Sequence, residues 1–110
     1  MASLSTHVLD TSVGRPAAGI PVTLERDGAP LGHGVTDQDG RIRGGEFGSG
    51  SAQLGPGSYR LVFAVEGYFA RRRIEAFYTS IPVQFTIGDD THYHVPLLLG
   101  PFGYATYRGS

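Results

Sequence analysis

Residues 92–108 read HYHVPLLLGPFGYATYR, and this stretch decides the fold class. Its first eight residues alternate in character, and one face carries Tyr93, Val95, Leu97 and Leu99. A period of two is that of a β-strand, whose successive side chains point to opposite faces of a sheet. The Gly-Pro-Phe-Gly sequence at 100–103 favours a turn, after which residues 104–108 return as a second strand. The stretch therefore predicts a strand pair with one strongly apolar face.

Further strands are predicted on both sides of this pair. Short apolar or alternating segments occupy residues 5–10, 20–25, 31–36, 41–43, 59–65 and 81–87. The apolar spacing of residues 68–77 predicts one short helix. Residues 44–57 are rich in Gly and Ser, so we expect a loop there, the most mobile part of the chain. Seven or eight short strands and one helix predict an all-β sandwich.

Composition excludes several classes of protein. The length of 110 residues predicts one domain over 1–110, and 40% hydrophobic with 17% charged residues argues against global disorder. A net charge of −1 gives no support to nucleic-acid binding. The absence of Cys excludes disulfides and thiolate catalysis. Neither a signal peptide nor a membrane span is recognisable, so we expect a soluble, cytoplasmic protein without membrane contacts.

Strand periodicity collects an unusual set of side chains on the face opposite the core. The set comprises His7, Leu9, His94, Pro96, Leu98 and Tyr107. Apolar residues here flank a few polar ones, which is typical of a binding surface or a subunit interface. The inference requires the strands that carry these residues to lie in one sheet.

Histidine suits acid–base catalysis because its ordinary pKa of ~6.5 makes both protonation states accessible near neutrality. His33 and His92 are interpreted as ordinary surface or structural residues. His92 and His94 could chelate a metal from one strand, but no third ligand is evident, so no metal is expected. No Gly-x-Ser-x-Gly nucleophile motif occurs, and residues 48–51 read as a flexible loop. Arg41 follows the Asp39-Gly40 turn, where it is either an exposed hairpin residue or a planar donor for carbonyl oxygens.

Several motifs, in the right order over nearly the whole chain, resemble one family. They are Thr6-His7-Val8-Leu9-Asp10-Thr11, Thr36 to Arg41, Gly57 to Phe63, His92 to Leu99 and Tyr104 to Ser110. The chain is similar in these motifs to the 5-hydroxyisourate hydrolases of the transthyretin-like family. The terminal Tyr-Arg-Gly-Ser is the most specific of them, because it separates these enzymes from hormone-carrying transthyretins.

The resemblance implies a fold, an assembly and a reaction. The fold would be a sandwich of two four-stranded sheets with one short helix. The assembly would be a homotetramer, a dimer of dimers with active sites in the channel between dimers. The reaction would be the hydrolysis of 5-hydroxyisourate to 2-oxo-4-hydroxy-4-carboxy-5-ureidoimidazoline in urate degradation, without cofactor or metal.

The resemblance also implies the site residues. The catalytic residues would be His7, Arg41, His94 and Ser110, and the substrate-binding residues would be Tyr107, Arg108 and Gly109. The two histidines would activate water and move a proton to the leaving ring nitrogen, with the choice of general base left open. Arg41 would stabilise the developing oxyanion. Gly100, Ala105 and Thr79 depart from the usual family residues, and only Ala105 would face the channel.

Two other readings share the same fold class. A transthyretin-type carrier of small ligands would have the channel but would lack His7, His94 and the Tyr-Arg-Gly-Ser end. A non-catalytic β-sandwich module would account for residues 36–41, 54–61 and 67–68, but it would not account for the C-terminal strand pair.

Overall fold

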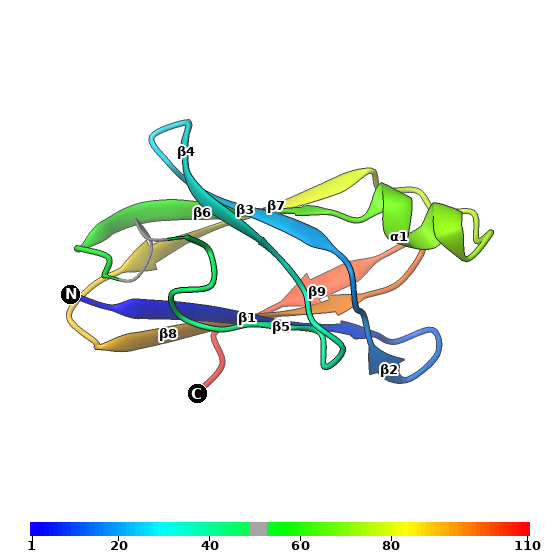
Figure 1. Ribbon diagram of the computed structural model, residues 1–110, viewed down its shortest axis with the longest axis horizontal. Helices are drawn as coiled ribbons and strands as arrows, with labels where there is room; N and C mark the ends of the chain where they lie inside the picture. Colours follow the sequence, from blue (N-terminus) through cyan, green and yellow to red (C-terminus); the bar gives the residue numbers. More distant parts are fainter. Residues whose placement is uncertain (49–52) are drawn as a thin grey trace.

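The computed structural model describes residues 1–48 and 53–110. These residues form strands in two sheets and one short helix (Figure 1). The elements are β1 (Ser3–Asp10), β2 (Arg15–Pro16), β3 (Pro21–Arg26), β4 (Ala29–Val35), β5 (Arg41–Ile42), β6 (Gly57–Ala64), α1 (Glu66–Arg71), β7 (Ser80–Ile87), β8 (His92–Leu99) and β9 (Tyr104–Thr106). The strand predicted at 92–99 has the predicted bounds, whereas the one predicted at 104–108 ends at Thr106.

The two sheets stack face to face as a sandwich, with α1 at one end (Figure 1). One sheet has the strand order β4-β3-β6-β7, and the other has the order β2-β1-β8-β9. The short strand β5 also pairs with β1. The predicted pair of four-stranded sheets is thus confirmed, with two-residue β5 as an addition. The first strand, β1, runs parallel to β8, although the two are far apart in the sequence. All the other strand pairs of the described residues are antiparallel.

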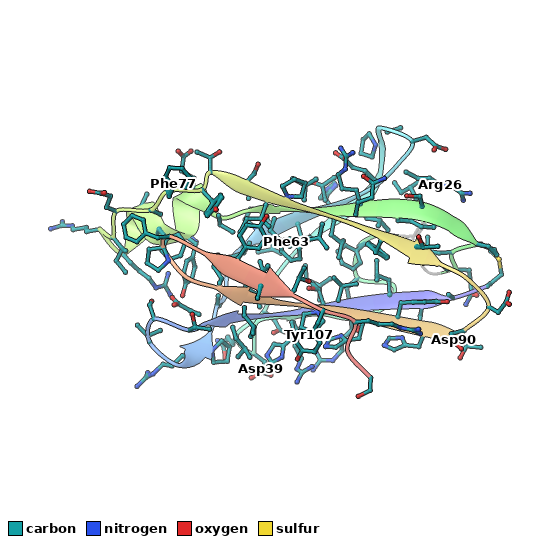
Figure 2. All side chains as sticks on the ribbon, turned by 180° about the vertical axis from the view of Figure 1, so that it is seen from behind. Arg26, Asp39, Phe63, Phe77, Asp90 and Tyr107 are labelled. Carbon is teal, nitrogen blue, oxygen red and sulfur yellow. The ribbon has the colours of Figure 1, made fainter. Side chains whose placement is uncertain are left out.

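The core lies between the sheets, where Phe63 is seen in Figure 2. The apolar face predicted for β8 is buried there, and it packs in the same core cluster as Tyr59, Leu61 and Phe63 of β6. Burial of a side chain of this size contributes roughly 1.5–3 kcal/mol. The opposite face of β8 is consequently free to carry polar side chains.

The predicted helix is wrong in its bounds. We expected it over 68–77, whereas α1 begins at Glu66 and ends at Arg71. Arg73 has a φ of 57°, and a left-handed residue interrupts a right-handed helix. Phe77, which the apolar spacing placed on the helix, is 72% exposed, and its N–H donates to the Pro101 carbonyl at 2.8 Å.

Part of the segment predicted as a mobile loop over 44–57 packs against the core. Phe47 and Leu54 are buried, and Leu54 exchanges two backbone hydrogen bonds of 2.8 Å with Ala2. Residues 49–52 lie outside the described residues, and with them most of the flexible turn expected at 48–51. Within the described ranges, no helix is long and apolar enough to cross a lipid bilayer.

Candidate functional site

The outer faces of β1 and β8 together form a continuous surface. Parallel pairing places Ser5 beside His94, His7 beside Pro96, and Leu9 beside Leu98. These side chains point away from the core, and all but the buried Pro96 are half-buried. The predicted grouping of His7 with His94 on a non-core face is therefore confirmed, since both strands lie in one sheet.

Arg41 reaches the same surface through β5, which pairs Arg41 with His7. The turn before it is held by one carboxylate: Oδ1 of Asp37 accepts the N–H groups of Asp39 and Arg41, each at 2.9 Å. Gly40 has a φ of 75°, and a Cβ there would lie 2.3 Å from the Val8 carbonyl oxygen. Only glycine therefore lets this turn press against β1 and deliver Arg41 to His7.

The C-terminal residues cross the surface beside His94. The N–H of Gly109 donates to the His94 carbonyl at 2.8 Å. A Cβ on Gly109 would lie 2.6 Å from Cδ2 of the His94 ring and 3.3 Å from Cγ of Pro96. The chain thus passes over His94 at a distance that only a glycine permits. Tyr107 and Ser110, on either side of this passage, are exposed.

Burial and charge lower the pKa of both histidines. For His94 the larger cause is burial, followed by the charges of Arg41, His7 and His92, while a hydrogen bond with the Ser5 main chain raises its pKa. For His7 burial again comes first and Arg41 second, while the Asp39 main chain acts against them. The lowered pKa favours the neutral form of both rings, which can accept a proton.

Ser5 is a site residue that the sequence reasoning missed. Its Oγ lies 2.7 Å from Nδ1 of His94 and 3.2 Å from Nε2 of His92. The signal was present, since Ser5 precedes His7 by two positions on a strand and must share its face. His92, interpreted as an ordinary surface residue, is exposed but takes part in this contact. His33 is exposed on β4 of the other sheet.

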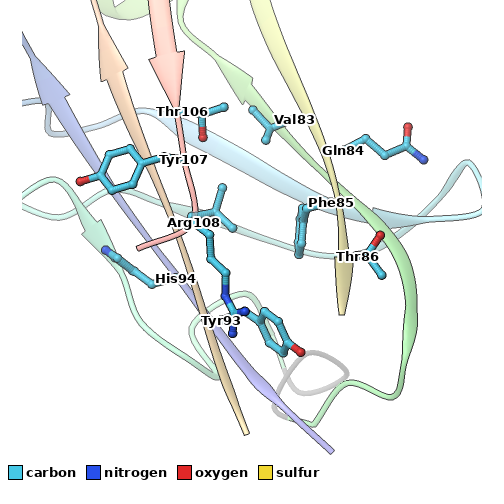
Figure 3. Close-up of a pocket in the computed structure, with 10 residues that line it drawn as sticks. Val83, Gln84, Phe85, Thr86, Tyr93, His94, Thr106, Tyr107 and Arg108 are labelled. Carbon is cyan, nitrogen blue, oxygen red and sulfur yellow. The ribbon is translucent and has the colours of Figure 1, made fainter. Parts of the chain in front are cut away.

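A hollow of about 320 Å³ lies between β7 and the C-terminal segment (Figure 3). His94, Tyr107 and Arg108 border it, but His7 and Arg41 do not. Figure 3 shows His94 and Tyr107 on the side away from β7. We assign the site to the outer face because the side chains of His7, Arg41 and His94 meet there.

Arg108 is engaged elsewhere than at the histidines. Its guanidinium donates to Oδ2 of Asp90 at 2.6 Å and lies 4.5 Å from the centre of the Tyr93 ring. This contact holds the segment after β9 in place. Ala105, one of the departures from the family pattern, is exposed in β9 opposite Leu98. Over residues 1–48 and 53–110, no group of three His, Cys, Asp or Glu side chains is arranged to hold a metal ion.

Comparison with known proteins points in one direction. Residues 4–109 match the model of the HIUase/Transthyretin family. A 5-hydroxyisourate hydrolase from Salmonella dublin is 45% identical over 97% of this chain and 80% of its own length. The structure of the 5-hydroxyisourate hydrolase of Klebsiella pneumoniae covers both chains fully, with 43% identity and a TM-score of 0.90. The transthyretin of Sparus aurata has a TM-score of 0.84 and 27% identity, covering 99% of this chain and 97% of its own.

Proposed function

The chain belongs to the HIUase/Transthyretin family, and from that premise we propose that it hydrolyses 5-hydroxyisourate in urate degradation. The product is 2-oxo-4-hydroxy-4-carboxy-5-ureidoimidazoline. The observation that carries this proposal is the meeting of His7, Arg41 and His94 on the outer face of β1 and β8. Identities of 43–45% to hydrolases add to it.

Ring opening adds water to a carbonyl carbon and then breaks the adjacent C–N bond. A neutral imidazole takes a proton from the water, and a proton must reach the leaving ring nitrogen. His7 and His94 suit the first step, because a lowered pKa favours the neutral imidazole, and a ring that has taken up the water proton can give it to the leaving nitrogen. The guanidinium of Arg41 stabilises the negative charge that develops on the carbonyl oxygen.

The C-terminal residues complete the proposed site. Gly109 lies against His94, and the exposed side chain of Tyr107 borders the same strand. Ser110 supplies a hydroxyl beyond Gly109, and we assign it to the catalytic group. The substrate-binding role of Arg108 rests on the resemblance alone, since its guanidinium contacts Asp90 here.

The proposal includes an assembly and a location. The outer sheet face is open on one chain, and a homotetramer made as a dimer of dimers would close it into a channel. A cytoplasmic location and a single domain over 1–110 are parts of the same proposal. Cell fractionation tests the location, and light scattering tests the assembly.

The two other readings fit the described residues less well. A transthyretin-type carrier would lack His7 and His94, whereas this face carries both histidines beside Arg41. Identity to the Sparus aurata transthyretin, at 27%, is also lower than identity to the hydrolases. A non-catalytic module gives no reason for the passage of Gly109 over His94.

The activity is tested by supplying the substrate directly. Urate oxidase generates 5-hydroxyisourate from urate in the same tube, and ¹³C NMR follows the carbon skeleton with and without this protein. The expected result is rapid accumulation of the ring-opened carboxylate. An unchanged lifetime of 5-hydroxyisourate would rule out the proposal.

A further inference from the structure

Two serines and two histidines alternate in an unbroken line at the start of β1 and β8. The parallel register places Ser3 beside His92 and Ser5 beside His94. Oγ of Ser3 lies 2.6 Å from Nδ1 of His92, and Nε2 of His92 lies 3.2 Å from Oγ of Ser5. Oγ of Ser5 lies 2.7 Å from Nδ1 of His94. The line connects an exposed ring, His92, to the half-buried ring of the candidate site.

The proton positions along this line depend on one another. A neutral imidazole carries one N–H and one acceptor nitrogen, and a hydroxyl has one proton to donate. In the arrangement in which the Ser3 hydroxyl donates to the Thr91 carbonyl, 3.4 Å away, Ser3 accepts from Nδ1–H of His92. Nε2 of His92 then accepts from the Ser5 hydroxyl, and Ser5 accepts from Nδ1–H of His94. Nε2 of His94 is left as the free acceptor.

We propose that Ser5 and His92 form a proton relay for His94, which makes His94 the general base. This inference rests on the proposed hydrolysis. When Nε2 of His94 takes a proton from water, its Nδ1 proton passes to Oγ of Ser5. The Ser5 hydroxyl proton passes in turn to Nε2 of His92. His94 ends neutral, Ser5 keeps one proton, and His92 becomes an imidazolium that exchanges with solvent.

The charges around the two rings favour this direction. His94 lies close enough to Arg41 and His7 for both to disfavour its protonation. His92 is exposed at the beginning of β8, so water can stabilise its charge. Reversal of the same transfers returns a proton to Nδ1 of His94, and the proton on Nε2 then passes to the leaving nitrogen. Ser5 is accordingly a positioning residue that does not touch the substrate.

The first test reads the tautomers and needs no turnover. In wild type, ¹⁵N NMR of labelled histidines is expected to show the neutral rings of His92 and His94 protonated at Nδ1. Ser5→Ala removes the acceptor of the His94 Nδ1 proton and should move the His94 ring toward the Nε2–H form, whereas His92 keeps its contact with Ser3. Ser5→Thr keeps a hydroxyl and should retain the wild-type pattern. Ser58→Ala on β6 of the other sheet is the matched control and should change neither ring. An unchanged His94 tautomer in Ser5→Ala would overturn the relay.

The second test separates proton transfer from binding. Ser5→Ala should lower kcat about tenfold or more while KM stays within about twofold, since general acid–base contributions are of this size or larger. Ser5→Thr should recover most of kcat. His92→Gln can still accept a hydrogen bond from Ser5 but cannot hold the proton, so kcat should fall similarly. Wild-type kcat in His92→Gln, or equal changes in KM and kcat, would contradict the relay. A wild type that shows the expected tautomers but no hydrolysis would instead defeat only the proposed function.

Discussion

Arg41 acts on both histidines of the site, because its charge, after burial, lowers the pKa of His7 and of His94. Its position depends on the Asp37 carboxylate, which accepts the Arg41 N–H at 2.9 Å, and on the turn glycine beside it. A guanidinium placed this way can stabilise an oxyanion while it keeps two imidazoles neutral. Arg41 thus both lowers the pKa of the histidines and can stabilise the developing negative charge.

Replacement of Arg41 by Gln should raise the pKa of both histidines. Loss of the positive charge makes the imidazolium less unfavourable, so each ring stays protonated to a higher pH. The acid limb of kcat/KM, which requires a neutral imidazole, should move to higher pH accordingly. Histidine titration by NMR and a pH–rate profile measure the two effects separately.

Arg43→Gln is the matched control for this prediction. Its guanidinium pairs with Asp37 at 3.0 Å and is not among the charges that shift either histidine. The titrations of His7 and His94 should therefore stay where they are. An equal shift in both variants would mean that general charge, rather than the position of Arg41, sets these pKa values.

Gly109→Ala should displace the His94 ring, because the added Cβ would lie 2.6 Å from its Cδ2. A misplaced reacting group commonly costs about 100-fold in rate, and Gly109 is half-buried on the outer face, away from the core. We expect a large fall in kcat with an almost unchanged melting temperature. Gly103→Ala, where a Cβ would meet no atom within 4 Å, is the control. Full activity in Gly109→Ala would show that the close approach of Gly109 to His94 is not needed for catalysis.

At the scale of elements, β1 and β8 carry the site between them, and their pairing explains what sequence could and could not predict. Alternation assigns the faces of each strand, so the grouping of His7 with His94 follows once both lie in one sheet. The parallel register that puts Ser5 beside His94 depends on tertiary packing and has no local signal. Arg41 entered only by resemblance, because a two-residue strand leaves no periodicity to read.

The helix shows the opposite failure. Four-residue spacing from Phe69 to Phe77 predicted ten residues of helix, but the left-handed Arg73 ends the regular structure early. Local spacing cannot detect this, because it ignores the backbone direction needed to bring the chain back to β7.

A buried hydrogen bond between Asp10 and Tyr68 joins β1 to α1, and we expect it to contribute to stability. Asp10 accepts hydrogen bonds from Ser12 and from the Tyr68 hydroxyl, the latter at 2.7 Å. Burial, and then Asp10, raise the pKa of Tyr68 to about 12, so Tyr68 remains a donor. Tyr68→Phe removes that donor from a buried carboxylate, which should cost about 1–3 kcal/mol of unfolding free energy.

Chemical denaturation of wild type and Tyr68→Phe measures this loss. Tyr78→Phe is the control, since its ring is only partly buried and pairs with Phe77 and Tyr104 by edge contacts. Equal stability of Tyr68→Phe and wild type would show that Ser12 alone satisfies Asp10.

For the whole molecule, the sandwich leaves the outer face of the β1–β8–β9 sheet open. The exposed side chain of Tyr107 lies along it, and the exposed Phe102 lies in the turn that leads to β9. Apolar groups of this size are typical of surfaces covered by another protein. The same sandwich occurs in a transthyretin, so the fold alone does not choose between carrying and hydrolysing.

Light scattering should give four times the mass of one chain. Leu98→Glu puts a charge on the outer face and should reduce the assembly to dimers or monomers, with a parallel loss of activity. Leu31→Glu on β4 of the other sheet is the control and should keep the wild-type mass. A fully active monomer in Leu98→Glu would contradict a site completed by association.

The most direct test of the central claim is the initial rate at which the ultraviolet absorbance of freshly made 5-hydroxyisourate disappears. We expect wild type to accelerate this decay well beyond the uncatalysed rate. We expect His94→Ala at the same concentration to lose at least about 100-fold of that acceleration while its melting temperature stays close to wild type. Decay at the uncatalysed rate with wild type, or wild-type acceleration by His94→Ala, would contradict the central claim.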